Sequence, residues 1–153
     1  MSAMSQNAMS RRAVQAYRGA AICVPLLKAM ILLLDRAISF LRKSTAAQQE
    51  QRFEESFVEL TRATSILRGL SHNLDFARGG ALAEQLYNTY NSLILACLHS
   101  YGKPRASENF HRIITSLVEL REAWEFVDGA AAAKSPRPVA ANQSSVLTPA
   151  AGR

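Results

Sequence analysis

The sequence lacks the features that define several classes of protein. Its 153 residues include only two cysteines, Cys23 and Cys97, which are too few and too far apart to form a disulfide framework. We expect both to be reduced thiols in the core of a cytosolic protein. No uninterrupted apolar run reaches the roughly 18 residues of a membrane span, and a run such as residues 29–34 lies between Lys28 and Asp35. The sequence therefore predicts neither a disulfide-stabilised scaffold nor membrane insertion.

Acidic residues are missing from both ends of the chain, although the formal net charge is +6. Residues 1–23 and 129–153 contain no Asp or Glu and carry three basic residues each, which leaves 12 basic and 12 acidic residues between them. A neutral middle does not supply the clustered positive face of a nucleic-acid-binding surface, so we expect no nucleic-acid partner. Residues 1–12 and the Ala/Pro-rich residues 129–153 are too poor in large apolar side chains to fold, and are predicted to be disordered.

Segments with strand-like alternation bounded by turn residues are also absent. Four segments instead carry apolar residues three and four positions apart, which is the spacing of one face of a helix. They span about residues 25–45, 48–73, 80–101 and 107–128. Connections of only a few residues favour antiparallel neighbours. We therefore predict an all-α fold, an antiparallel up-down-up-down four-helix bundle, over residues 25–128.

Residue patterns typical of catalytic, metal or cofactor sites are incomplete. Gly79-Gly80 follows a helical segment rather than a strand and lacks the Lys-Ser or Lys-Thr of a phosphate loop, so we interpret it as a turn between two helices. Residues 108–111 form a single E-x-x-H, whereas a di-iron bundle needs two copies and further carboxylates. His72 is the nearest candidate for phosphotransfer, but the acidic Asp75 follows it. We predict no catalytic residue, no metal and no cofactor, and therefore no enzyme.

Three phrases lie on the predicted first, third and fourth helices. They are "LLLDRAISFL" at residues 32–41, the set Leu74-Asp75, Gly79-Gly80, Ala83, Leu86-Tyr87 and Tyr90, and "LVELREAW" at residues 117–124. A weaker fourth phrase is "VQAY" at residues 14–17. In this order they resemble the motifs of the flagellin-export chaperones, the FliS family. The resemblance covers about residues 14–128.

The chain departs from that family's pattern at two places. The family usually enters its first helix with "TASP", and this chain has "ICVP" at residues 22–25, without the capping serine. The family also has a tyrosine before and a glycine after the aspartate that corresponds to Asp35, where this chain has Leu34 and Arg36. Because Leu34 and Arg36 differ from the family's residues, the resemblance does not predict which contacts are made at these two positions. A divergent paralogue is an alternative.

The resemblance implies a cytoplasmic chaperone that binds the C-terminal segment of flagellin, prevents its early polymerisation and delivers it to the flagellar export gate. We expect a monomer or a weak dimer. In the family the N-terminal segment can cover part of the binding groove, so residues 13–24, with Val14 and Tyr17, are the expected lid segment. The alternatives are a generic helical adaptor or regulator that binds another partner helix, and a histidine phosphotransfer bundle that uses His72.

Surplus apolar residues on the first and third helices extend beyond the narrow stripe that a bundle must hide. A methionine and a tyrosine at such positions suit an adaptable binding surface. Trp124 is expected to anchor the core. The alternative is that the surplus residues only widen a single large core. The groove candidates for a partner helix are Leu26, Met30, Leu33, Leu82, Tyr87, Ile94 and Leu98.

Overall fold

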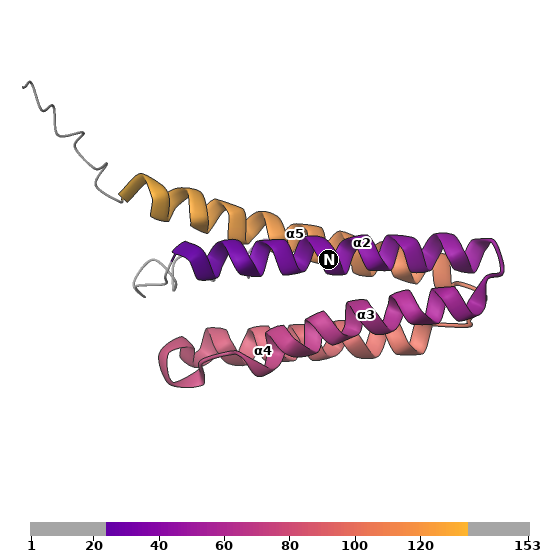
Figure 1. Cartoon of the computed structure of the whole chain (residues 1–153). Coiled ribbons are helices and arrows are strands. Elements are labelled where there is room, and N and C mark those ends of the chain that lie inside the picture. Colours follow the sequence, from indigo (N-terminus) through magenta and orange to yellow (C-terminus); the bar gives the residue numbers. More distant parts are fainter. Residues whose placement is uncertain (1–23, 135–153) are drawn as a thin grey trace, which may run out of the picture.

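The computed structural model describes residues 24–134, which form four helices and no strand. The helices are α2 (Val24–Gln49), α3 (Phe53–His72), α4 (Phe76–Ser100) and α5 (Ala106–Lys134). Because every connection is short, the helices run alternately in opposite directions (Figure 1). The predicted antiparallel four-helix bundle is therefore confirmed.

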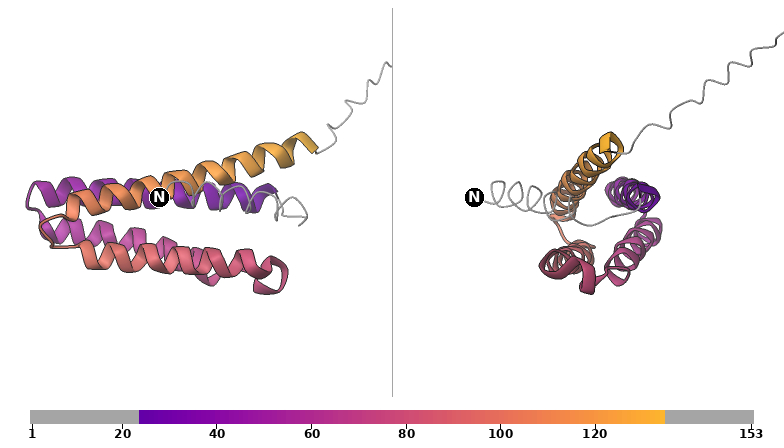
Figure 2. Two further views of the ribbon diagram at one scale, coloured as in Figure 1. Left: turned by 180° about the vertical axis from the view of Figure 1, so that it is seen from behind. Right: turned by 90° about the vertical axis from the view of Figure 1, so that its left-hand side faces the viewer.

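The four helices form a ring. α2 packs against α3 and α5, and α4 packs against the same two helices, while the diagonal pairs make no comparable contact. The end-on view in Figure 2 shows this order, and both of its views show α5 leaning away from α4 toward the C-terminal end of α5. α2 and α3 are the most closely packed pair, so the side formed by α4 and α5 is the loosest.

Several helix boundaries differ from those expected, among them the start of α4 at Phe76 instead of about residue 80. α2 continues to Gln49 and α3 starts only at Phe53, so the expected start at residue 48 is wrong. The turn between them contains no Gly or Pro to mark it, and Gln51 takes a positive φ of 60° there. α5 continues through residues 129–134, which were expected to belong to the disordered tail because of their composition. Most of these residues are alanine, which has the highest helix propensity of all residue types.

The predictions for the chain ends fall largely outside the described residues. This is the case for the disorder expected in residues 1–12, for residues 13–23 of the lid segment, and for the tail from residue 135 onward. Residue 24, the last residue of the expected lid segment, is the first residue of α2.

The core is one apolar cluster to which all four helices contribute. Its largest fully buried side chains include Trp124, Tyr90 and Phe110, so the expectation that Trp124 anchors the core is confirmed. Cys97 is also buried, and this burial raises the pKa of its thiol to about 12. The thiol therefore stays protonated and packs as a small apolar group. Cys23 lies outside the described residues.

Two serines join α2 to α3 inside the core. Ser44 Oγ donates to the backbone carbonyl of Ser56 at 2.8 Å, and Ser56 Oγ donates to the backbone carbonyl of Ser44 at 2.9 Å. Both residues are fully buried. The reciprocal bonds satisfy both hydroxyls, as buried polar groups require, and fix the register of α2 against α3.

The Gly79-Gly80 pair lies in the first turns of α4. Asp75 caps this helix, because its carboxylate accepts a hydrogen bond from the backbone N–H of Arg78 at 3.0 Å. The backbone leaves helical geometry at Gly80, with φ of 49° and ψ of −130°, before the helix resumes. Only glycine adopts these angles without strain. The connection between α3 and α4 lies at residues 73–75, so the glycine pair forms a kink inside α4 rather than the expected turn between the two helices.

None of the helices in residues 24–134 is both long and apolar enough to cross a membrane. Within the same residues, no three His, Cys, Asp or Glu side chains gather in an arrangement that could hold a metal ion.

Candidate functional site

Several residues of the three family-like sequence motifs, at residues 32–41, 74–90 and 117–124, hold the bundle together. Asp35 of the first phrase and Arg121 of the third form an ion pair between α2 and α5, in which Arg121 Nε donates to Asp35 Oδ1. This hydrogen bond raises the pKa of Arg121 above its ordinary value. Asp75 and Gly80 of the second phrase shape the start of α4. These four residues therefore have structural roles, and a binding site has to be found on other side chains.

Pairs of large apolar residues recur every seven positions along α2. The second member of each pair is buried, namely Leu27, Leu34 and Leu41. The first members form a separate stripe, because a seven-residue spacing stays on one side of a helix. Of this stripe, Leu26 is 56% exposed, Leu33 is 39% exposed and Phe40 is half-buried. α2 thus has an accessible apolar stripe beside its core face.

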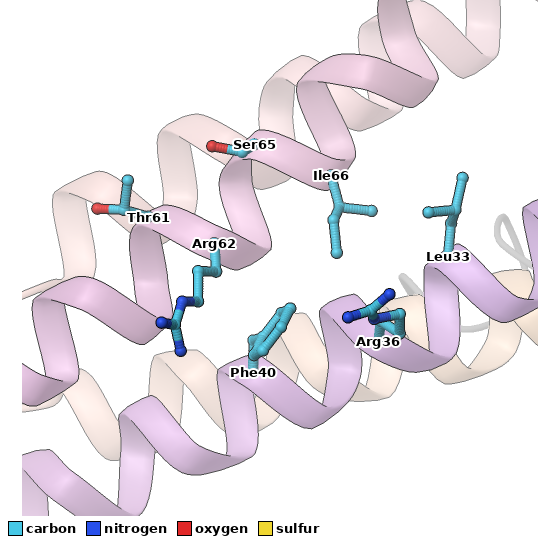
Figure 3. Close-up of a pocket in the computed structure, with 7 residues that line it drawn as sticks. All are labelled: Leu33, Arg36, Phe40, Thr61, Arg62, Ser65 and Ile66. Carbon is cyan, nitrogen blue, oxygen red and sulfur yellow. The ribbon is translucent and has the colours of Figure 1, made fainter.

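This stripe borders a shallow hollow between α2 and α3, which we call the α2–α3 groove (Figure 3). It is lined by Leu33, Arg36 and Phe40 of α2 and by Thr61, Arg62, Ser65 and Ile66 of α3. Phe40 and Ile66 point into the space between the two helices. The groove encloses about 330 Å³, which is at the lower end of the range for small-molecule sites. Its size suits the protruding side chains of a partner.

Positive charge surrounds the apolar floor of this groove. The guanidinium of Arg62 lies 5.8 Å from the centre of the Phe40 ring, and Lys43 Nζ lies at the same distance from that ring. Arg62 is paired with the largely buried Glu59, with 2.8 Å between Arg62 Nη1 and Glu59 Oε1. Arg36 makes no ion pair with any residue in the described part of the chain. The groove therefore has an excess of positive charge.

A second apolar surface lies along the other edge of α3, where α3 meets α4. We call it the α3–α4 strip, and its members are Phe53, Phe57, Phe76, Tyr87, Leu95, Leu98 and Tyr101. The rings of Phe57 and Tyr101 contact each other with their centres 5.5 Å apart. The rings of Phe76 and Tyr87 do so at 5.8 Å. Most of these side chains are exposed, and the strip contains five aromatic rings.

The leucines of the strip lie on the α3 side of α4. Asn91 of α4 reaches Ser71 of α3, with 3.5 Å between Asn91 Nδ2 and Ser71 Oγ. Leu98 follows Asn91 by seven positions and Leu95 follows it by four, so both lie on the same side of α4 as Asn91. Leu95 is 54% exposed and Leu98 is 45% exposed. Exposed apolar side chains thus border α3 on both edges.

The seven groove candidates from the sequence divide between surface and core. Leu26, Leu33, Tyr87 and Leu98 are exposed, and Met30 is half-buried against the core. Leu82 is 8% exposed and Ile94 is 6% exposed, so we correct their assignment to a groove: both are core residues.

Ile94 was misplaced because α4 is apolar at every position from 93 to 98. Both Leu93 and Ile94 lie three or four positions from Tyr90 and from Cys97, so either residue could belong to the same helical face as these two. The spacing alone therefore does not tell which of them is buried. In the structure, Ile94 is buried in the core and Leu93 is only partly buried.

The other candidates have less support as sites. Val14 and Tyr17 lie outside the described residues. His72 is the exposed last residue of α3, whereas phosphotransfer needs an exposed histidine in mid-helix. Glu108 and His111 are exposed in the first turns of α5.

Sequence reasoning missed several residues that form these surfaces. The recurring pair at positions 40 and 41, in phase with the pairs at 26 and 27 and at 33 and 34, could have identified Phe40. Ile66 and Arg62 of the groove had no comparable signal. They line the same groove as Arg36 only because of the register between α2 and α3, which the spacing of residues along the sequence does not report.

An all-α bundle that exposes apolar side chains along both edges of one helix has the architecture of a protein-binding module. The family model described as flagellar protein FliS matches residues 9–131 of the chain. The chain therefore belongs to the FliS family of flagellar proteins. Membership in this family supports a general role in flagellar export as a chaperone. No curated protein matches the sequence.

Proposed function

We propose that this protein is a cytoplasmic export chaperone that binds the C-terminal segment of flagellin. It prevents premature polymerisation and delivers flagellin to the flagellar export gate. The observation that carries the proposal is the exposed apolar surface on both edges of α3, in a member of the FliS family. The α2–α3 groove and the α3–α4 strip together offer a partner an extended path across three helices.

An extended path is what an unfolded client requires. Ordering a disordered segment costs about 1.5 kcal/mol per residue, and burying apolar area contributes about 25 cal/mol per Å². A compact pocket offsets the ordering of only a few residues. Two surfaces on successive helices allow a client to form amphipathic helices that dock one after another. The net affinity stays modest, because the ordering cost removes most of the gain, and this suits later release.

The test is to mix the full-length chain with the C-terminal segment of flagellin from the same organism. We expect a 1:1 complex by calorimetry and a gain in helical circular dichroism beyond the sum of the components. The double variant L33S/L98S, with one exposed leucine changed on each surface, should bind more weakly. The matched control is Leu32→Ser, because Leu32 is 63% exposed but belongs to neither surface.

Two results would count against this function. One is the absence of both a calorimetric signal and a helicity gain with the wild-type chain. The other is equal binding of an unrelated amphipathic helix, which would make the protein a generic helical adaptor. If Leu32→Ser weakens binding as much as the double variant does, the two surfaces are not where the client docks.

A further inference from the structure

We propose that Arg36 makes the α2–α3 groove selective for a client helix whose apolar stripe is bordered by carboxylates. The inference rests on the proposed chaperone function, because it specifies the chemistry of the client segment that docks in this groove. It assigns to Arg36 a role in specificity.

The apolar floor sets the kind of segment that fits. Leu26, Leu33 and Phe40 form a stripe whose first and last residues are 14 positions apart, and at a rise of 1.5 Å per residue it extends for about 21 Å. Ile66 of α3 faces this stripe from the other wall of the groove. A helix of about the same length can lay apolar residues spaced three and four apart along the floor. A single side chain or a small ligand would leave most of the stripe exposed.

The position of Arg36 sets the charge of that segment. Arg36 follows Leu33 by three positions and precedes Phe40 by four, so its side chain lies beside both on the same side of α2. A client residue next to the docked apolar stripe therefore comes within reach of its guanidinium. Arginine binds a carboxylate through two parallel N–H donors, which gives the contact direction as well as charge.

The surrounding charges leave Arg36 available for this contact. Arg62 is already paired with Glu59, whereas Arg36 has no ion-pair partner within the described residues. Lys43 on the same rim adds a further positive charge. Residues 24–128 are neutral as a whole, so the excess charge at the groove is local. A client bordered by lysine or arginine would meet like charge there and be disfavoured.

The test compares two charge reversals on the same helix. Arg36→Glu places a negative charge at the groove. Arg42→Glu is the matched control, because Arg42 is also exposed but follows the α5-facing Asp35 by seven positions, on the flank of α2 away from the groove. Binding of the flagellin C-terminal segment is measured by calorimetry at low and at high salt. Thermal melts monitored by circular dichroism verify that both variants fold.

We expect Arg36→Glu to raise Kd roughly tenfold at low salt, Arg36→Ala to raise it about threefold, and Arg42→Glu to change it less than twofold. The difference should shrink in about 1 M salt, where the screening length falls to about 3 Å. Replacing each Asp and Glu of the client by Lys in turn should identify one position that restores binding to Arg36→Glu. Such a rescue is a direct sign of pairwise coupling.

The possible failures are distinguishable. If the wild-type chain does not bind the segment, both this inference and the chaperone function are overturned. If the wild-type chain binds, but Arg36→Glu has no effect or the same effect as Arg42→Glu, the charge selectivity is wrong while the chaperone function stands. Tighter binding by Arg36→Glu would show that the docked segment is basic.

Discussion

Two residues one turn apart on α4 separate a docking surface from the core. Leu98 is 45% exposed in the α3–α4 strip, whereas Ile94 is 6% exposed and belongs to the core. The change from Leu98 to Ala removes three carbon atoms, worth about 2.4 kcal/mol if fully buried, at about 0.8 kcal/mol each. Because Leu98 is 45% exposed in the free bundle, roughly half of this stabilisation is already present there. The remaining free energy, about 1.1 kcal/mol, would be gained only when a client covers the side chain.

Leu98→Ala should therefore lower the free energy of unfolding by only about 1 kcal/mol and raise the Kd for the flagellin segment about sixfold. Ile94→Ala should lower the free energy of unfolding by about 2–5 kcal/mol, because it leaves a cavity. It should leave Kd nearly unchanged in protein that is still folded. Urea denaturation followed by circular dichroism measures the first quantity, and calorimetry well below the melting temperature measures the second.

The reverse pattern would refute this reasoning. If Ile94→Ala weakens binding more than Leu98→Ala while both proteins remain folded, the client does not dock on the surface seen here. It would instead enter between the helices after they separate, and the buried Leu82 and Ile94 would then be client contacts.

Three further predictions concern the kink in α4, the core polar pair and the thiol. Gly80→Ala should lower the free energy of unfolding by about 1–3 kcal/mol because of the positive φ, whereas Gly69→Ala, in open space on α3, should raise it by up to about 1 kcal/mol; equal effects in urea would contradict this. Ser44→Ala should lower it by about 0.5–1.5 kcal/mol, because the carbonyl of Ser56 loses the hydrogen bond from Ser44 Oγ, while Ser56 Oγ keeps its bond to the carbonyl of residue 44; a neutral result in the same assay would rule out a role in register. Cys97, with its pKa raised to about 12, should resist a thiol reagent at pH 8 in a Cys23→Ser background until urea is added. Since the unfolded thiol ionises near pH 9 while the folded one stays protonated, its contribution to stability should decline from that pH upward, and rapid labelling without urea would show that Cys97 is accessible.

The helices could be predicted from the sequence, because their apolar residues repeat with the period of a helix. Leu27, Leu34 and Leu41 repeat on one face of α2, and all three are buried. Helix ends were less predictable, because they depend on backbone angles. The residue at the α2–α3 turn with positive φ is Gln51, which no composition rule marks as a turn residue. The alanine run at residues 130–133 favours helix, although the prolines beyond it give the segment the composition of a tail.

The docking surfaces were harder to predict, because exposure is a property of the assembled bundle. Leu26 and Leu33 were singled out from the sequence and are exposed, but Leu82 and Ile94 were singled out on the same grounds and are buried. An apolar residue beside a core stripe becomes surface or core according to how closely the neighbouring helix approaches. That distance depends on contacts such as the Ser44–Ser56 pair, which the sequence does not report.

Within the first family-like phrase, residues 32–41, the structure also separates a residue that holds the bundle together from residues that face the proposed client. Asp35 points toward α5 and pairs with Arg121, while the next residue, Arg36, lines the α2–α3 groove. Adjacent positions on a helix differ by about 100°, so one of them can hold the bundle together while its neighbour contacts a partner. Changes at Arg36 can therefore alter the client without disturbing the ion pair that joins α2 to α5. A match to the family consequently supports the fold more directly than it identifies the client, and the client's identity has to be determined at Leu33, Arg36 and Phe40.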